Sequence, residues 1–479
     1  MTQQVSNPPE QDETQPAQTT PPDSQHPRSS MLEVIILLSL VGLLVVSSLG
    51  ALLFNVIQAA SGSTALTPTV SASQTTLAGK ATPAPTLSPT PVSDAPFSPP
   101  DNAPIAVLQL PTGHTLIYEE DTGIYLVSSA GGTPQQLSTP GYLYNEAARP
   151  ILTPADELLY SGTNGIWLIN IFTGITTRVA TLAPNQVITA MTLSSDGTTI
   201  AWSTQAANGG GVIAVFAGSL TAPVKVFAQS STHCPCFRVF SFLNGKGKQG
   251  NDTLLLTDSQ QSYEAIQYGL WSLDLTAPPL TAQPLLLLPE NTSQGPLALA
   301  PYSNVLLYSS YEGDIPVPTD GSVPADIGTL TYPNSLDVTT LAGRPLKTDI
   351  TQTLLPEQHD LPNSAEYHWI TTPVFTPDGH SIIYVEFSSL SQPPYDRSSA
   401  IFIASISGAG KSLRVGQPQL LLTSTARLVE LGGWFSNNVL TIYADNALYA
   451  LNIQHDTIAA IIHTYTYARI IGSVGTGNV

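Results

Sequence analysis

Cysteine and basic residues are scarce in this chain of 479 residues. Two cysteines are too few for a disulfide framework or for a four-cysteine zinc site. Fifteen Lys and Arg against 34 Asp and Glu give a formal net charge of −19. A protein this acidic lacks the cations that nucleic-acid phosphates require. These shortages exclude a disulfide-rich scaffold and argue against a general nucleic-acid-binding protein.

Helical periodicity is also missing from most of the chain. After residue 57, no stretch of about 11 residues keeps apolar side chains at the i, i+3, i+4 and i+7 positions of an amphipathic helix. A TIM barrel is excluded because it needs a helix between successive strands. The folded part of the protein is therefore expected to be all-β.

One long apolar run is present, from Val34 to Ile57. Its 24 residues carry no formal charge, and as a helix rising about 1.5 Å per residue they cross a hydrocarbon core of roughly 30 Å. We interpret 34–57 as a transmembrane helix that acts as a signal anchor. The alternative is a cleaved signal peptide, which normally has a shorter apolar core after a short basic leader.

The flanks of this run decide the expected topology. Arg28 lies close to its amino-terminal end, whereas Lys80 is the nearest basic residue on the other side, so the positive-inside rule favours a cytoplasmic amino terminus. Residues 1–30 are rich in Gln, Pro and Thr and are expected to form a disordered cytoplasmic tail. Residues 58–104 are rich in Pro, Ser and Thr and are expected to form a disordered linker. The remainder would be extracytoplasmic, at the cell membrane.

The remainder, 105–475, repeats one pattern seven times. Each copy has Pro or Ser, then turn-forming residues, then two or three apolar residues and usually an aromatic one. The clear copies begin at Pro111, Pro154, Ser195, Pro301, Pro377 and Ser436, and a weaker copy runs from Asn244 to Leu256. Apolar strands precede and follow each turn, as in Ile105 to Leu110 before the first. Four-stranded units repeated in this way predict a β-propeller, with seven blades favoured and six or eight as alternatives.

The Pro-Asp-Gly-x-x-Ile-x-aromatic unit at 377–384 and the Ser-Asp-Gly unit at 195–202 resemble the WD40-like repeats of TolB-type propellers. They also resemble the amino-terminal propeller of the dipeptidyl-peptidase group. The resemblance to the dipeptidyl-peptidase group implies a separate hydrolase domain with a Gly-x-Ser-x-Gly elbow. This chain has no such elbow. The resemblance therefore supports the fold and not the peptidase activity.

The end of the chain bears on ring closure. The seventh unit begins near 428–434, and one short apolar strand, Ala468 to Val474, remains after it without a unit of its own. A propeller must join its first and last blades or leave strand edges exposed. We predict that this strand pairs with the first blade, built from about 105–137.

The two cysteines form the most unusual motif, His233-Cys234-Pro235-Cys236. Three interpretations remain open: a small strained disulfide between Cys234 and Cys236, a soft-metal site that includes His233, and two thiols without a role. The disulfide is the favoured one.

Other polar motifs favour ordinary loops. Gly410-Lys411-Ser412 resembles the end of a phosphate-binding loop, but Ser405 stands where the first glycine is required, so a hairpin loop is expected. The acidic segments 311–326 and 119–121 are expected to be solvated, the second as a hairpin tip. No catalytic, cofactor-binding or metal-binding residue is predicted.

These observations favour a non-enzymatic module that binds an unknown protein or cell-envelope component, anchored to the membrane by one helix and without nucleic acid or cofactor. Two alternatives remain: an enzyme whose active site lies in the propeller channel, and a ligand sensor. A convergent cluster of His and acidic side chains at the channel would favour the enzyme.

Overall fold

The computed structural model describes residues 96–475 with short gaps at 101–104, 106, 111, 130, 146–147, 209, 233–234, 244–250, 259–267, 291–294, 311–334, 356–366, 390–396, 427, 456 and 465. The predicted tail 1–30, the predicted membrane helix 34–57 and the predicted linker as far as residue 95 lie outside these residues. In the part of the chain that is described, no helix has the length and apolar character needed to cross a membrane.

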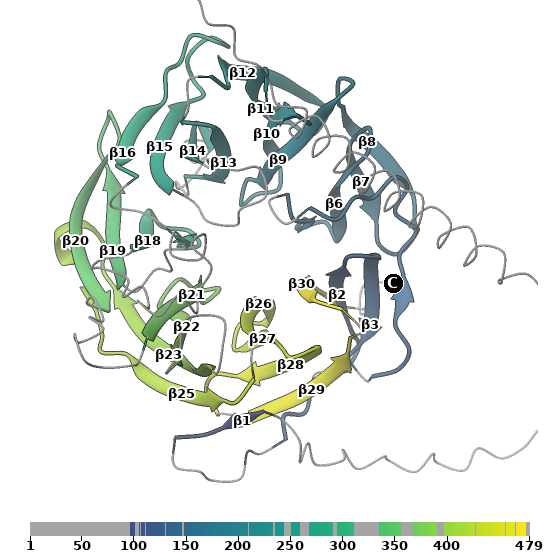
Figure 1. Cartoon of the computed structure of the whole chain (residues 1–479), viewed down its shortest axis with the longest axis vertical. Helices are drawn as coiled ribbons and strands as arrows, with labels where there is room; N and C mark the ends of the chain where they lie inside the picture. The colour runs from purple at the N-terminus through teal and green to yellow at the C-terminus, as the bar shows by residue number, and fades with distance from the viewer. Residues whose placement is uncertain are drawn as a thin grey trace, which may run out of the picture. The chain divides into compact units, whose positions relative to one another are not determined.

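The unit from Leu87 to Val479 folds as a seven-bladed β-propeller of antiparallel sheets, which confirms the predicted fold class and blade number. Figure 1 shows the blades arranged around a centre, with β9, β13, β21, β26 and β30 on the inner side. Six blades have four strands, and the sixth blade has six.

The strands of the blades, from the innermost outwards, are as follows. Blade 1 contains β30 (Ala468–Gly475), β2 (His114–Glu120), β3 (Gly123–Ser128) and β4 (Gln135–Gln136). Blade 2 contains β5 (Ile151–Leu152), β6 (Glu157–Gly162), β7 (Gly165–Asn170) and β8 (Thr176–Thr181). Blade 3 contains β9 (Gln186–Leu193), β10 (Thr199–Ala206), β11 (Val212–Ser219) and β12 (Ala222–Ser230). Blade 4 contains β13 (Phe237–Phe242), β14 (Thr253–Asp258), β15 (Tyr268–Asp274) and β16 (Leu285–Leu288).

The remaining blades follow the same order. Blade 5 contains β17 (Leu297–Leu299), β18 (Val305–Ser310), β19 (Ser335–Ala342) and β20 (Lys347–Leu355). Blade 6 contains β21 (Tyr367–Phe375), β22 (Ser381–Ser389), β23 (Arg397–Ser407), β25 (Gln419–Ser424) and β1 (Phe97–Ser98), with β24 (Arg414–Val415) beside β23. Blade 7 contains β26 (Val429–Ser436), β27 (Val439–Ala444), β28 (Ala447–Asn452) and β29 (Thr457–His463).

The last strand closes the ring, as predicted. β30 pairs antiparallel with β2 along its whole length, from His114 opposite Gly475 to Glu120 opposite Ala468. It takes the innermost place in blade 1, which the sequence had suggested for residues 105–110. In that segment Val107 makes one parallel bridge to Ile458 of blade 7 instead. The reason is that each side of β2 accepts only one neighbouring strand, and β30 and β3 occupy both.

Blade 6 gains an outer strand from the other end of the folded unit. Phe97 lies opposite Ser424 of β25, and Ser98 lies opposite Thr423. These two residues fall inside the range predicted as linker, so chain pairing in the propeller starts earlier than residue 105. Phe97 is buried and makes an edge contact with Tyr449 of blade 7, with ring centroids 5.2 Å apart. A buried aromatic ring of this size contributes enough apolar area to hold a short strand in place.

Seven hydrophobic clusters, counted over the described residues, fill the seven interfaces between neighbouring blades. One of them joins Leu116 and Tyr118 of blade 1 to Val439 and Tyr443 of blade 7, across the closing interface. The aromatic residues of the repeat are buried, which confirms that they form blade core; they are Tyr118, Tyr160, Trp202, Tyr308, Tyr384 and Tyr443. Burial of each large apolar side chain stabilises the fold by roughly 1.5–3 kcal/mol.

The Asp-Gly turns of the repeat have the expected backbone. Gly197 and Gly379 have φ of +71° and +72°, a region that strongly favours glycine. The preceding aspartates brace the turns: Asp196 accepts a 2.6 Å hydrogen bond from the Ser194 hydroxyl, and Asp378 accepts an equivalent bond from the threonine two residues before it. Local turn chemistry therefore explains why this motif recurs from blade to blade.

Candidate functional site

A buried ion pair lies on the inner strands of blade 1. Glu119 of β2 and Arg469 of β30 are direct cross-strand neighbours, and Arg469 Nη2 lies 2.8 Å from Glu119 Oε2. Glu119 is 1% exposed and Arg469 is 6% exposed. Two charges at this depth cost several kcal/mol each in lost hydration, so they persist only with well-placed partners. The pair therefore places two opposite charges inside blade 1, away from water.

The partners come from the segment that links blade 1 to blade 2. The Tyr142 hydroxyl donates a hydrogen bond to Glu119 Oε1, and Arg469 Nη2 donates one of 3.5 Å to the carbonyl of Asn145. The Arg469 guanidinium also lies 4.8 Å from the centre of the Tyr144 ring. Such a cation over an aromatic face is stabilised by the ring quadrupole. The segment itself is held by the Asn145 side chain, which donates a 2.8 Å hydrogen bond to the carbonyl of Ile188 in blade 3.

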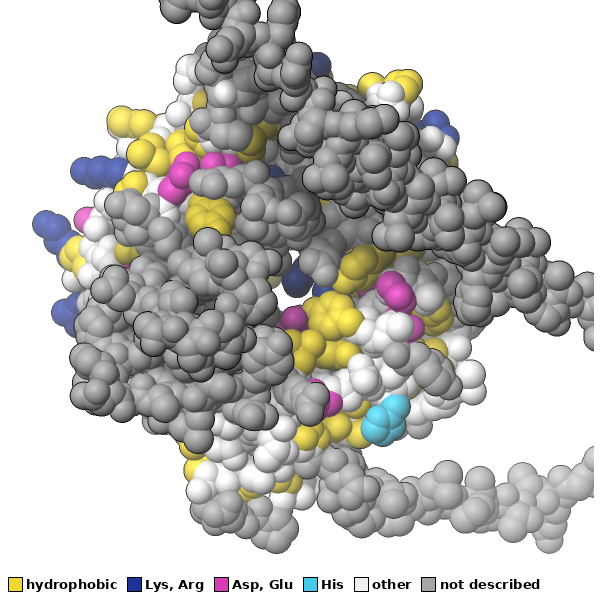
Figure 2. All heavy atoms as spheres, viewed as in Figure 1, with side chains coloured by type: hydrophobic (Ala, Val, Ile, Leu, Met, Phe, Trp, Pro, Cys, Tyr) yellow, Lys and Arg dark blue, Asp and Glu magenta, His cyan; other side chains and the backbone are white. Residues whose placement is uncertain are grey.

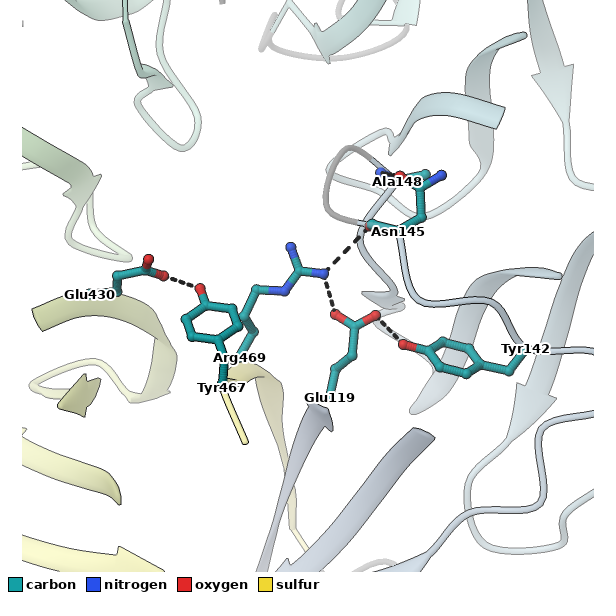
Figure 3. Close-up of polar contacts among 7 residues, drawn as sticks. All are labelled: Glu119, Tyr142, Asn145, Ala148, Glu430, Tyr467 and Arg469. Atoms are coloured by element: carbon teal, nitrogen blue, oxygen red, sulfur yellow. Dashed lines mark hydrogen bonds and ion pairs between the residues drawn. The ribbon is translucent and has the colours of Figure 1, made fainter. Parts of the chain in front are cut away.

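A second carboxylate–tyrosine pair lies beside the first. The Tyr467 hydroxyl donates a hydrogen bond to Glu430 Oε2 of β26 in blade 7. Figure 3 shows Glu430, Tyr467, Arg469, Glu119 and Tyr142 in one row, with the two carboxylate–tyrosine pairs on either side of Arg469. Unlike Glu119, Glu430 and Tyr467 are only half-buried. Tyr142 is half-buried as well, so Glu119 and Arg469 are the deeply buried part of the row.

Burial controls the protonation of this row. It raises the pKa of the Glu119 carboxyl above its ordinary value, and Arg469 and Tyr142 oppose part of that rise. Burial and the Glu119 carboxylate raise the pKa of Tyr142, while burial and the Glu430 carboxylate raise the pKa of Tyr467. Both phenols therefore stay protonated near neutral pH and act as hydrogen-bond donors.

The row belongs to the centre of the propeller. Arg469 and Glu430 lie on β30 and β26, the innermost strands of adjacent blades (Figure 1). Figure 2 shows an opening near the centre of the view, with basic, acidic and hydrophobic side chains around it. Arg149 is exposed, and its positive charge acts on both Glu119 and Tyr467. The arrangement places a carboxylate, a phenol and a cation close together near the inner strands of blades 7 and 1.

The sequence motifs fall elsewhere. Cys236 has no free thiol in the structure, and its backbone N–H donates a 2.5 Å hydrogen bond to Asp258. Cys234 and His233 lie outside the described residues, so the bridge between Cys234 and Cys236 stays a prediction. The segment 311–326 also lies outside them. Gly410–Ser412 forms one 3-10 turn between β23 and β24, as a loop in a hairpin would.

The prediction that the acidic segment 119–121 is a solvated hairpin tip is wrong in part. Asp121 is exposed, as expected for a hairpin tip, but Glu119 and Glu120 are buried at 1% and 8% exposure. The strand runs two residues further than its apolar run, which carries both glutamates into the blade. The sequence did contain one indication of the ion pair, because Arg469 is the single cation of the apolar closing strand. If that strand pairs with the first blade, Arg469 needs an acidic partner there.

No family model matches this chain, and no curated protein matches it. It is similar in fold to an oligogalacturonate lyase solved with manganese, at 14% identity and a TM-score of 0.42, over 75% of this chain and 86% of that one. It is similar to the periplasmic gluconolactonase PpgL of Pseudomonas aeruginosa, at 13% identity and a TM-score of 0.42, over 74% and 98%. It is also similar to an ancestral GH74 enzyme, at 12% identity and a TM-score of 0.43, over 75% and 47%.

These likenesses concern the fold alone. All three proteins are enzymes by name, and this finding corrects the prediction of a non-enzymatic binding module and the prediction that the chain is not an enzyme. The missing hydrolase domain argued only against peptidase activity, and the alternative of an active site in the propeller channel does not need that domain. Within the described residues, no three His, Cys, Asp or Glu side chains are grouped so that they could hold a metal ion.

Proposed function

We propose that the protein is an enzyme whose active site lies at the central opening and which performs general acid–base chemistry on a small carboxylate-bearing substrate. The observation that carries the proposal is the pair of carboxylate–tyrosine contacts on either side of Arg469, near the inner edge of blades 7 and 1 (Figure 3). The cluster expected of a channel enzyme included histidine. Here tyrosine takes that place.

The roles follow from burial and from the ion pair. Glu430 and Tyr467 are half-buried and lie outside the Glu119–Arg469 ion pair, so we assign the proton transfers to them: Glu430 takes a proton from the substrate, and Tyr467, which is protonated at neutral pH, donates one. Glu119 is too deeply buried to touch a substrate, and it positions Arg469 and Tyr142. Arg149 is exposed beside the row and supplies the cation that attracts an anionic group. Elimination and hydrolysis are the reactions that need only these parts.

The test is an activity screen against small acidic substrates. Purified protein is incubated with sugar lactones that keep a free carboxylate and with uronate-containing oligosaccharides, and hydrolysis is followed by acid release and elimination by ultraviolet absorbance of the unsaturated product. We expect Glu430→Gln and Tyr467→Phe each to lower kcat by about 10²–10⁴-fold, the usual contribution of a general acid or base. Arg149→Leu should mainly raise KM.

Two matched substitutions control for changes unrelated to the site. Glu157→Gln in blade 2 and Tyr302→Phe, whose side chain is 72% exposed, should leave kcat and KM unchanged. The proposal fails if wild-type protein neither turns over nor binds any of these compounds. It also fails if Glu430→Gln retains wild-type kcat.

We also propose that residues 34–57 anchor the propeller at the outer side of the cell membrane. The support is the uncharged run of 24 residues with Arg28 on its amino-terminal side. Protease added to intact spheroplasts should then remove the propeller and spare residues 1–30. Release of the protein by a carbonate wash would contradict the anchor, and protection of the propeller would reverse the orientation.

A further inference from the structure

A pocket of about 370 Å³ lies on blade 6, apart from the central row. Its volume is within the range of small-molecule sites, roughly 300–1,000 Å³. Seven of its ten lining residues are serine or threonine, and the others are Glu386, Ala400 and Phe402. Blade 6 is drawn at the lower edge of the ring in Figure 1, where β22, β23, β25 and β1 run side by side.

Strand register explains how the pocket is built. Glu386 of β22 lies opposite Ala400 of β23, Ala400 lies opposite Thr423 of β25, and Thr423 lies opposite Ser98 of β1. Because paired residues point to the same face of a sheet, these side chains form one row across four strands. Ala400 is the smallest side chain in the row, and it leaves a hollow between Glu386 and Thr423. The outer strand β1 completes the far wall with Ser98.

The rows on either side give the pocket two different ends. At one end, the hydroxyls of Ser388 and Ser398 lie 2.8 Å apart and share a hydrogen bond. At the other end, Phe402 stacks on the buried Tyr384 ring, with centroids 5.5 Å apart and planes 16° from parallel. The pocket therefore has a hydroxyl-rich end, an aromatic end and a carboxylate at its side.

A buried hydroxyl beside the pocket is unsatisfied. Among the described residues, the Tyr384 hydroxyl has no hydrogen-bond partner, although its residue is fully buried. Tyr384 lies two residues before Glu386 on the same face of β22, and the Glu386 carboxylate, after burial, raises the pKa of Tyr384. Because Tyr384 is fully buried and does not line the pocket, it acts by holding the Phe402 ring in place and not by binding a ligand.

We propose that this pocket is a second binding site, which takes a neutral polyhydroxylated ligand of the size of one or two sugar units. Sugar hydroxyls both donate and accept hydrogen bonds, as the serine and threonine hydroxyls of the lining require. A carboxylate accepts strong hydrogen bonds from adjacent sugar hydroxyls. The apolar C–H face of a pyranose packs on an aromatic ring such as that of Phe402. This proposal does not depend on catalysis at the central row.

The test is calorimetric titration of the full-length protein with glucose, galactose, mannose, N-acetylglucosamine, maltose and cellobiose. We expect millimolar binding of at least one of them. Glu386→Gln keeps the shape and removes the charge, so it should weaken binding by about tenfold. Ala400→Leu fills the hollow and should abolish binding.

Two control variants make the same chemical changes elsewhere. Glu157→Gln and Ala222→Leu, the latter at an exposed position of β12, should bind the sugars as wild-type protein does. Thermal melts of all variants separate lost binding from lost folding. The proposal is overturned if no sugar binds the wild-type protein or if Ala400→Leu binds normally. It is also overturned if ethanolamine, a small cation that would pair with the Glu386 carboxylate, binds in preference to every sugar. Glu430→Gln should leave sugar binding intact, which separates this site from the central one.

Discussion

The buried pair Glu119–Arg469 allows a sharp stability prediction, because its two members can be removed singly or together. Arg469→Met removes the cation and leaves the Glu119 carboxylate, 1% exposed, with the hydrogen bond from Tyr142. Glu119→Leu leaves a guanidinium that is 6% exposed and takes away the acceptor of the Tyr142 hydroxyl. Breaking a buried ion pair from one side costs about 3–5 kcal/mol. We expect each single variant to lose this much.

The double variant Glu119→Leu/Arg469→Met should lose far less. Both charges are then gone, and two apolar side chains of similar length pack in their place, which is often close to neutral. The Tyr142 hydroxyl still lacks its acceptor, so a loss of about 1–3 kcal/mol remains. The two single losses together, about 6–10 kcal/mol, should therefore exceed the loss of the double variant by at least about 3 kcal/mol, which is the upper end for residues in contact.

Urea unfolding monitored by tryptophan fluorescence and circular dichroism measures these four free energies. Arg414→Met, an exposed arginine of β24, is the matched control and should change stability by less than about 0.5 kcal/mol. The sign of the pH dependence adds a check. In Arg469→Met, the raised pKa of Glu119 means that stability is greatest below its ordinary value of 4.5 and falls as pH rises through the raised value. Single losses under about 1 kcal/mol, or additive losses, would refute the account of this pair as a buried and coupled unit.

Three further predictions follow from the closing strand, the braced turns and the cysteine motif. Deleting 466–479 removes the innermost strand of blade 1, and we expect a much lower melting temperature and self-association through the freed edge; a truncated protein that melts like the parent and stays monomeric would contradict this. Asp196→Asn should cost about 1 kcal/mol at pH 7, after allowance for solvent screening, because hydrogen bonds from its own turn lower the pKa of Asp196 to about 2. That difference should vanish as pH falls from about 4 to 2, and urea melts at both ends of this range would detect it. Native mass spectrometry without reductant should find no alkylatable thiol at Cys234 or Cys236; two free thiols would exclude the bridge.

The architecture was predictable because its signals are local. Turn residues such as Asp196-Gly197 and the apolar alternation beside them act within about ten residues, and each copy repeats the same local pattern. The seven copies predict seven blades. The one strand that remains after the seventh copy, Ala468–Gly475, is predicted to close the ring. Sequence reasoning therefore reached the fold, the number of blades, the buried aromatic residues and the partner of the last strand.

The sites depended on contacts that no local pattern contains. Glu119 and Asp121 look alike in the sequence, but only Glu119 meets Arg469, which lies 350 residues away on a strand whose register the whole ring determines. The pocket of blade 6 likewise needs Ser98 beside Thr423, from opposite ends of the folded unit. Burial and electrostatic pairing are properties of three-dimensional neighbours, so the same acidic residue is a solvated tip or part of a charged cluster according to which strand lies opposite it. The repeats are therefore enough to predict the propeller, whereas its buried charges and its pocket depend on contacts between distant strands.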